Sequence, residues 1–292
     1  SLLLWEAWQN DYVRPQQQAE QLAVSESSLP DVPAPMTDVT ATNQQDLPDM
    51  PVVQSLDSLP AIDQAVEVMS ANKVHVKTDL IDVVIDTQGG DIRSLALLDY
   101  PVESSAPDVP VQFLAETASR YFVVQSGLRS DSLAPTHYDQ YRSENSNYEL
   151  LDGQNEIVVP LHWTTDAGLT VTKTYRFHRD SYLIDVDYQV ENNSGERFSA
   201  YPYAQFNRNR PQEDSGFIYT YTGAVFSTEG NEYEKIDFDD LDDAAFSRTA
   251  TGGWTAMIQH YFVAALVPES DDKENGFYGK SINKRNYTAG MK

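Results

Sequence analysis

The segment from Lys77 to Pro101 constrains the fold of this 292-residue chain more than any other. Bulky apolar residues occupy every second position from Ile81 to Ile85, which is the period of a β-strand rather than a helix. Gly89 and Gly90 follow, and glycine adopts the positive φ of a tight turn without steric cost. Residues 92–98 then read as the returning strand. The segment therefore predicts a β-hairpin.

Most of the chain beyond residue 72 repeats this two-residue period. The cleanest amphipathic strand is predicted at Tyr182–Val190, where Tyr, Ile and Val alternate with mainly polar residues in ordinary core patterning. Further strands are predicted at 111–114, 121–125, 157–163, 170–177, 198–206, 217–221, 224–227 and 287–292. Pro202 predicts an edge strand or a bulge, and residues 130–147, 207–216 and 237–243 are predicted loops. This pattern is typical of an all-β fold, a large antiparallel β-sandwich.

Residues 252–268 are apolar and ambiguous in period. Trp254, Ile258, Tyr261 and Ala265 would also share one face of a helix. We predict two buried strands instead, because a Gly-Gly pair and a proline bracket the run and Gln259-His260 interrupts it.

The first 71 residues differ in composition from the rest. Residues 1–9 combine a Leu run with Trp5 and Trp8, which is typical of the outer end of a transmembrane helix; a short amphipathic helix is the alternative. Residues 10–71 contain seven prolines among Gln, Ser, Asp, Thr and Ala, and bury too little apolar surface to offset the entropy of ordering. They predict a disordered acidic linker. No run approaches the ~20 apolar residues of a complete membrane span.

Charge and cysteine content narrow the possible partners. The chain has 45 Asp and Glu against 20 Lys and Arg, a formal net charge of -25. Nucleic acid and anionic lipid are bound through basic patches, so this balance argues against both. Few Lys and Arg agree with a periplasmic or extracellular location; a soluble acidic protein is the alternative. The absence of cysteine excludes disulfides, thiol nucleophiles and zinc–thiolate sites.

Candidate chemical groups are scattered. No H-x-H or H-E-x-x-H pattern occurs, so the histidines predict no metal site. They are His75, His137, His162, His178 and His260. Asp185 and Asp187 are expected about 7 Å apart on one strand face, and Asp82 and Asp86 also share a face. Glycoside hydrolysis uses two carboxylates at such a separation, but a solvated strand face explains them better.

The acidic run 237–243 is the other candidate site, in this case for binding a calcium ion. Its aspartates offer oxygen ligands for calcium but lack the Gly and the terminal Glu of a regular calcium loop, so a solvated loop is predicted. These aspartates are Asp237, Asp239, Asp240, Asp242 and Asp243, with Asp271 and Asp272 a weaker case. Trp163, Trp254 and the many tyrosines are compatible with a sugar or peptide groove and equally with core packing. No catalytic, cofactor-binding or metal residue is therefore predicted.

Three separated blocks resemble one protein family and occur in its order. They are residues 77–101, Tyr233-Glu234-Lys235 with Phe238, and residues 252–268. Together they resemble the large periplasmic domain of the YidC-type membrane protein insertases of bacteria. The resemblance covers roughly the whole chain from Lys73 onward.

The resemblance implies a β-supersandwich, similar to galactose-mutarotase-like folds, over residues 72–292, with residues 1–9 ending the first transmembrane helix. It implies a multi-pass protein of the bacterial inner membrane with this domain in the periplasm, and a chain truncated at both ends. The family is non-enzymatic, uses no cofactor, and aids insertion and folding of inner-membrane proteins, alone or with the Sec translocon.

The partners implied are nascent inner-membrane proteins, Sec accessory subunits such as SecF, and the lipid bilayer through transmembrane helices mostly absent from this sequence. The family's insertion groove lies between those helices, so none of its residues transfers to this chain. Edge strands and the loop before Gly252 are the candidate contact regions.

Two other functions stay open from the residues alone. One is a secreted carbohydrate-binding or carbohydrate-active β-sandwich, which requires His and Asp or Glu to converge on one concave face. The other is a chaperone-like domain that holds emerging polypeptide on an open edge strand.

Overall fold

The computed structural model describes residues 73–117, 119–211, 221–259, 261–269 and 272–292. The expected membrane-helix end at 1–9 and the expected linker at 10–71 lie outside these residues. The strand predicted at 217–221 also lies outside them, except for Tyr221.

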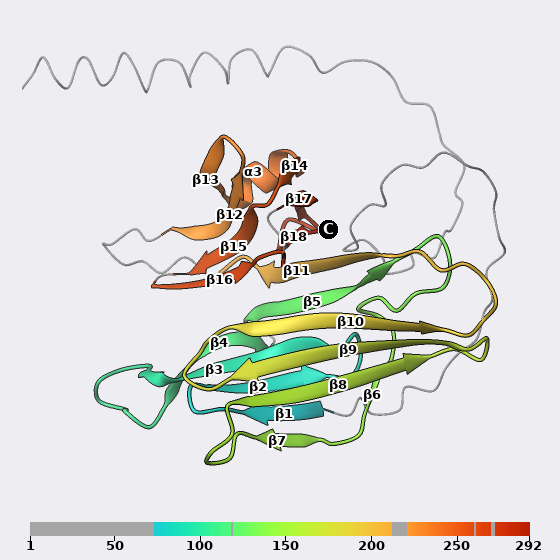
Figure 1. Cartoon of the computed structure of the whole chain (residues 1–292). Helices are drawn as coiled ribbons and strands as arrows, with labels where there is room; N and C mark the ends of the chain where they lie inside the picture. Colours follow the sequence, from blue (N-terminus) through green and yellow to red (C-terminus); the bar gives the residue numbers. More distant parts are fainter. Residues whose placement is uncertain (1–72, 118, 212–220, 260, 270–271) are drawn as a thin grey trace, which may run out of the picture. The chain divides into compact units, whose positions relative to one another are not determined.

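The largest of three sheets has ten strands in the order β14-β17-β18-β11-β5-β4-β3-β2-β1-β7 (Figure 1). Its strands are β1 (Lys73–Lys77), β2 (Ile81–Asp86), β3 (Asp91–Pro101), β4 (Pro110–Glu116), β5 (Tyr121–Arg129), β7 (Asn147–Glu149), β11 (Tyr201–Asn209), β14 (Phe246–Thr251), β17 (Glu274–Ser281) and β18 (Asn286–Met291). Its pairings are antiparallel, apart from the parallel pair of β1 and β7.

The other two sheets have four antiparallel strands each. The β8–β10 sheet, in the order β10-β9-β8-β6, contains β6 (Arg142–Ser143), β8 (Glu156–Thr164), β9 (Leu169–His178) and β10 (Ile184–Asn192). The β12–β16 sheet, in the order β13-β12-β15-β16, contains β12 (Thr222–Thr228), β13 (Asn231–Ile236), β15 (Trp254–Gln259) and β16 (Phe262–Leu266). A short helix, α3 (Phe238–Asp243), joins β13 to β14.

The β8–β10 sheet packs face to face on the β1–β5 part of the ten-stranded sheet (Figure 1). Every second residue of β9 points inward, and Val171 and Phe177 have no exposed surface. The inward-facing side chains of β8 and β2 are buried as well, and Leu161 and Val83 are each 0 % exposed. This arrangement is the sandwich predicted from the alternating pattern, since each sheet contributes one apolar face to a shared core.

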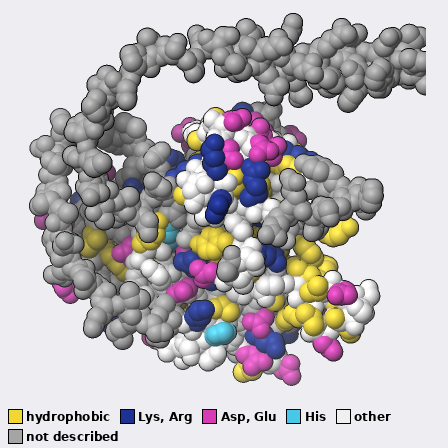
Figure 2. Space-filling view, turned by 180° about the vertical axis from the view of Figure 1, so that it is seen from behind, with side chains coloured by type: hydrophobic (Ala, Val, Ile, Leu, Met, Phe, Trp, Pro, Cys, Tyr) yellow, Lys and Arg dark blue, Asp and Glu magenta, His cyan; other side chains and the backbone are white. Residues whose placement is uncertain are grey.

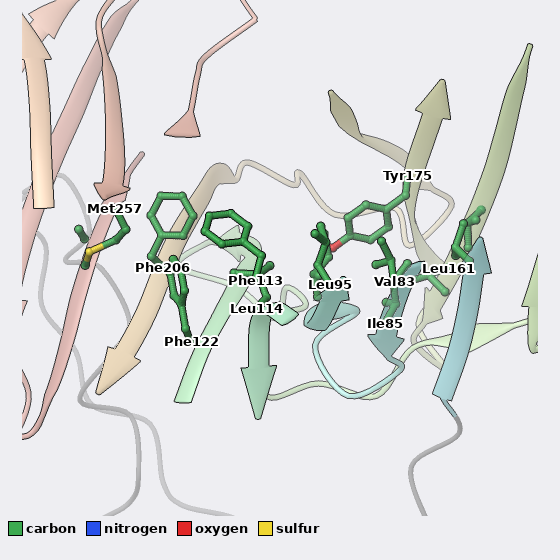
Figure 3. Close-up of a cluster of buried hydrophobic side chains, with 14 of the residues drawn as sticks. Val83, Ile85, Leu95, Phe113, Leu114, Phe122, Leu161, Tyr175, Phe206 and Met257 are labelled. Carbon is green, nitrogen blue, oxygen red and sulfur yellow. The ribbon is translucent and has the colours of Figure 1, made fainter. Parts of the chain in front are cut away.

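The β12–β16 sheet continues the same core beside β11, β17 and β18. Figure 3 shows Met257, Phe206, Phe122 and Phe113 in a row that leads from this sheet into the sandwich. The Arg208 guanidinium of β11 donates to the side-chain oxygen of Gln259 in β15 at 2.9 Å. The described strands thus form an all-β, almost wholly antiparallel structure, as predicted.

The hairpin prediction is confirmed. β2 pairs with β3 in an antiparallel hairpin, and φ is +74° at Gly89 and +59° at Gly90. The run 252–268 forms two antiparallel strands, β15 and β16, so the strand interpretation holds over the helical one. β16 is more exposed than predicted, because only alternate side chains face the core.

Two strand predictions need correction. β11 is not an edge strand, because it pairs with β5 on one side and β18 on the other. Pro202 is tolerated because β18 pairs only from Ala204 onward, so no neighbour there requires a donor from the proline nitrogen. The face of β10 predicted to be buried is only partly so: Ile184 and Tyr188 pack against the core, but Val186 and Val190 are 40 % and 39 % exposed, because β10 is the last described strand of its sheet.

Three loop predictions need correction. Residues 207–209, predicted to begin a loop, are the last three residues of β11. Residues 237–243 form α3 rather than a loop, with Asp237 as its N-cap. The 130–147 segment contains β6 and leads into β7, and its Tyr141 is only 1 % exposed. Because that segment is mostly polar, its sequence did not indicate that Tyr141 is buried.

Candidate functional site

The ammonium group of Lys173 lies inside the sandwich, next to the turn between β2 and β3. Lys173 projects from the inward row of β9 and has no exposed surface. Its Nζ donates to the carbonyl oxygens of Gly89 at 3.0 Å and Ser126 at 3.1 Å. The rings of Tyr141, Tyr175 and Tyr188 surround it, with centroids 5.4–5.9 Å from Nζ.

Burial governs the ionisation of this cluster. It lowers the pKa of Lys173 to about 8, with the charge of Asp91 opposing the shift. Burial raises the pKa of Asp91, whose side chain accepts from Arg93 at 3.0 Å and from Gln125 at 3.2 Å. Lys173 and Asp91 are both fully enclosed, so the cluster locks the two sheets together and offers no surface to a substrate.

The carboxylates of Asp185 and Asp187 in β10 each contact a side chain of the neighbouring strand. Asp185 Oδ2 lies 2.7 Å from His178 Nε2, and Asp187 Oδ2 lies 3.3 Å from Arg176 Nε, both on the neighbouring strand β9. These pairs lie on the outward face of the sheet, where all four side chains are partly exposed. They are cross-strand contacts on a solvated face, a hydrogen bond for His178 and Asp185 and an ion pair for Arg176 and Asp187, as the simpler interpretation predicts. Asp82 and Asp86 also point away from the core, and Asp86 accepts from the Gln88 amide in the turn.

The described histidines stay apart. His75 is exposed on β1, His137 is buried against the Tyr203 hydroxyl at 2.7 Å, and His162 contacts the Thr172 hydroxyl at 3.1 Å. His178 pairs with Asp185 as above, and His260 lies outside the described residues, as does Asp271. Within the described ranges, no three His, Cys, Asp or Glu side chains form a group able to hold a metal ion.

The acidic run has a structural role in α3. Asp237 Oδ1 accepts from the amides of Asp239 and Asp240 at 2.9 Å each, and Asp240 accepts from the Asp237 amide at 3.1 Å. This reciprocal pair is a capping box. Asp242 accepts from the hydroxyl of Ser281 at 2.6 Å and from Arg210 at 3.1 Å, and both bonds help to lower its pKa. These carboxylates are therefore already occupied by protein donors.

The two tryptophans of the described residues, Trp163 and Trp254, are divided between core and surface. Trp163 is 9 % exposed within the sandwich core, and Trp254 lies 6.4 Å from Tyr233, centroid to centroid, at the start of β15. They do not meet, so they do not form the two walls of one groove.

An exposed apolar area lies at one end of the sandwich, and we call it the aromatic end patch. It consists of the exposed side chains of Tyr100, Val102, Val109, Tyr182 and Leu183, together with the half-buried ring of Phe262 at its border. The ring of Tyr100 lies 6.3 Å from Tyr182 and 5.4 Å from Phe262. Figure 2, seen from behind, shows hydrophobic side chains gathered on the side of the molecule where the β3–β4 loop lies. Single exposed apolar residues are common, but a contiguous group marks a contact surface.

Sequence reasoning missed both the lysine cluster and the patch. A signal for Lys173 exists, because it occupies the inward register between Val171 and Tyr175. The patch carries no local signal, since its residues come from the end of β3, the β3–β4 loop, the β9–β10 turn and the start of β16. No helix within the described ranges is long and apolar enough to cross a membrane.

The fold and these sites define an all-β sandwich domain with an enclosed Lys173–Asp91 cluster, cross-strand pairs on an outer face and an exposed apolar patch at one end. The family model of the YidC periplasmic domain matches residues 73–292. The chain belongs to the YidC periplasmic domain family.

Curated relatives agree with this membership. A protein of Nitrosococcus oceani named membrane protein insertase YidC is 37 % identical over 297 residues, which cover 99 % of this chain and 51 % of that protein. Proteins of the same name from Methylococcus capsulatus and Coxiella burnetii are each 39 % identical, covering 98 % and 74 % of this chain and 50 % and 38 % of their own length. The chain spans about half the length of the first of these relatives.

Proposed function

We propose that this chain is the periplasmic portion of a multi-pass membrane protein insertase of the bacterial inner membrane. The observation that carries the proposal is the family match across residues 73–292, together with relatives of that name matched over nearly the whole chain. The described residues support a non-catalytic role, because their carboxylates and histidines are paired, buried or separated. The whole protein then aids the insertion and folding of nascent inner-membrane proteins, without a cofactor.

The proposal includes three regions of the chain. Residues 1–9 end a transmembrane helix, residues 10–71 form an acidic linker, and residues 72–292 form the periplasmic domain, with the bilayer reached through further helices of the whole protein. Deleting residues 10–71 should leave the melting temperature of the β domain nearly unchanged. A large drop in melting temperature would contradict the linker assignment.

The Sec translocon is the proposed partner for part of this activity, through accessory subunits such as SecF. The sheet edges support such a contact, because edge strands offer unpaired backbone groups. Affinity capture of the whole protein from detergent-solubilised membranes should retain SecF. Capture of the intact protein without SecF, at a salt concentration that preserves the translocon, would contradict this partner.

Depletion tests the insertase activity itself. When the native protein is depleted in its source bacterium, a reporter inner-membrane protein should remain accessible to protease on the wrong side of the membrane, and re-expression should restore insertion. An unchanged rate of insertion during verified depletion would contradict the proposed activity. The enclosed Lys173 cluster predicts that variants at that site act through domain stability rather than through loss of a reacting group.

A further inference from the structure

Six strands lie at sheet edges in the described structure, and they differ in charge. β6, β7, β10, β13 and β14 each carry at least one charged side chain. These side chains are Arg142 in β6, Glu149 in β7, Asp185, Asp187 and Glu191 in β10, Glu232, Glu234 and Lys235 in β13, and Arg248 in β14. A charge on an edge strand opposes pairing with another chain. β16 reads Phe-Val-Ala-Ala-Leu and carries none.

The core holds β16 in place while leaving one edge available. Phe262, Ala264 and Leu266 face inward and pack against the buried cluster. Val263 points outward and is 60 % exposed. β16 pairs with β15 along its whole length, and no described strand pairs with its other edge. Its outer N–H and C=O groups thus form a template for a further strand.

Apolar and acidic groups lie beside this edge. Phe262 begins β16 and also belongs to the aromatic end patch, through its contact with Tyr100. Exposed carboxylates border the two features: Asp99, Glu103 and Asp108 lie next to the patch residues in the chain, and Glu269 follows β16. The nearby base Arg120 is already bound to the carbonyl of Phe113 at 2.8 Å.

We propose that the outer edge of β16, with the aromatic end patch, binds an extended apolar segment of another polypeptide that carries Lys or Arg on its flanks. The segment adds as a strand beside β16, where main-chain hydrogen bonds give affinity and the patch contacts its apolar side chains. Basic flanks complement the carboxylates around the edge. A second copy of this chain fits poorly, because two chains of net charge -25 would bring the same carboxylates together.

A labelled synthetic peptide tests the proposal on the 292-residue chain. The peptide has about six alternating Val, Ile and Thr residues, the usual length of a strand, between pairs of Lys. Its matched control has the same side chains with alternate backbone nitrogens methylated, in both alternation phases, so that strand pairing is blocked. Fluorescence anisotropy should show saturable binding of the first peptide and about tenfold weaker binding of at least one methylated form.

Two matched variants locate the site. Val263→Lys places a charge on the β16 edge and should weaken binding by about tenfold or more. Val186→Lys makes the same change on the β10 edge, where Val186 is 40 % exposed, and should leave binding unchanged. Circular dichroism and thermal melting establish that both variants fold. If Val263→Lys unfolds, Ala265→Lys on the same exposed face replaces it.

Four outcomes would overturn the proposal: no saturable binding, equal binding of both methylated forms, binding unaffected by a folded β16 variant, or equal loss in Val186→Lys. A dimer in sedimentation that disappears in Val263→Lys would reassign the edge to a second copy. The peptide assay uses the chain alone, so its failure leaves the depletion experiment on insertase activity unaffected.

Discussion

The ammonium of Lys173 donates to the carbonyl oxygen of Gly89 at 3.0 Å, and this bond ties the middle of β9 to the turn between β2 and β3. The tyrosine hydroxyl two residues further along β9, that of Tyr175, donates to the next carbonyl, that of Gly90. The hairpin turn that dominates the sequence pattern is therefore also the point at which the two sheets of the sandwich are joined.

Stability should depend on pH through Lys173. Its pKa in the folded chain is about 8, below the ordinary 10.5, so the unfolded chain binds the extra proton between these pH values. The free energy of unfolding therefore rises with pH across that window, by about 1–3 kcal/mol in total. Denaturant titrations at pH 7.5 to 10.5 should show this rise in the native chain relative to Lys173→Met, which lacks the titrating group. Parallel pH profiles for the two proteins would contradict the account.

The turn should tolerate no side chain at Gly89. Its φ is +74°, and an added Cβ would lie 2.5 Å from the backbone oxygen of His137, which cannot move independently. We expect Gly89→Ala to lower the free energy of unfolding by about 3 kcal/mol or more.

Gly153→Ala is the matched control for that substitution. Gly153 also has a positive φ, of +83°, but nothing lies within 4 Å of an added Cβ, so only the backbone cost of about 1 kcal/mol applies. Equal losses in the two variants, measured by denaturant unfolding, would show that the contact with His137 has no effect.

The N-cap of α3 should contribute measurably to stability. Replacing Asp237 by Ala removes the acceptor for the Asp239 and Asp240 amides and should cost about 1 kcal/mol. Asp243→Ala, at the exposed end of the same helix, removes a carboxylate from the negative end of the helix dipole. That variant should change the unfolding free energy by less than about 0.5 kcal/mol. A larger effect for Asp243→Ala than for Asp237→Ala would contradict the cap assignment.

The strands that face a core were predictable because their side chains alternate. β2, β8 and β9 have two faces in clearly different environments, and their side chains alternate accordingly. The sequences of β13 and β17 show no such alternation. β13 is an edge strand with mostly exposed side chains, and β17 contains two glycines that suggest turns. Close packing instead explains the glycine at position 279, since a Cβ there would lie 3.1 Å from Leu241 and 3.2 Å from Phe226.

The helix α3 was not predicted because its capping pattern spans only a few residues and its aspartates were considered as calcium ligands. Asp237 with Asp240 three residues later is a capping pattern, but a run of aspartates also resembles a metal loop. Only two residues of α3, Phe238 and Leu241, are buried, which is too few to show a helical period. Charge composition alone could not separate the two interpretations.

The exposure of β10 and of the aromatic end patch depends on which strands lie side by side in the fold. The order of residues within a single strand does not predict this. β10 has the cleanest alternation in the chain, yet Val186 and Val190 remain partly exposed because no strand lies beyond β10. The aromatic end patch likewise exists only because the end of β3 with the β3–β4 loop, the β9–β10 turn and the start of β16 meet at the same place. The solvated-face interpretation of Asp185 and Asp187 is confirmed, because both side chains are partly exposed and contact residues of the neighbouring strand β9.

The most direct test of the central claim is an immunoblot of the native protein. Antibody raised to residues 73–292 is applied to inner membranes of the source bacterium after a carbonate wash. We predict a band retained in the membrane at roughly twice the 32.8 kDa of this chain, because the chain spans about half of its relatives. A band of about 32.8 kDa that is released by carbonate into the soluble fraction would contradict the assignment to a membrane insertase.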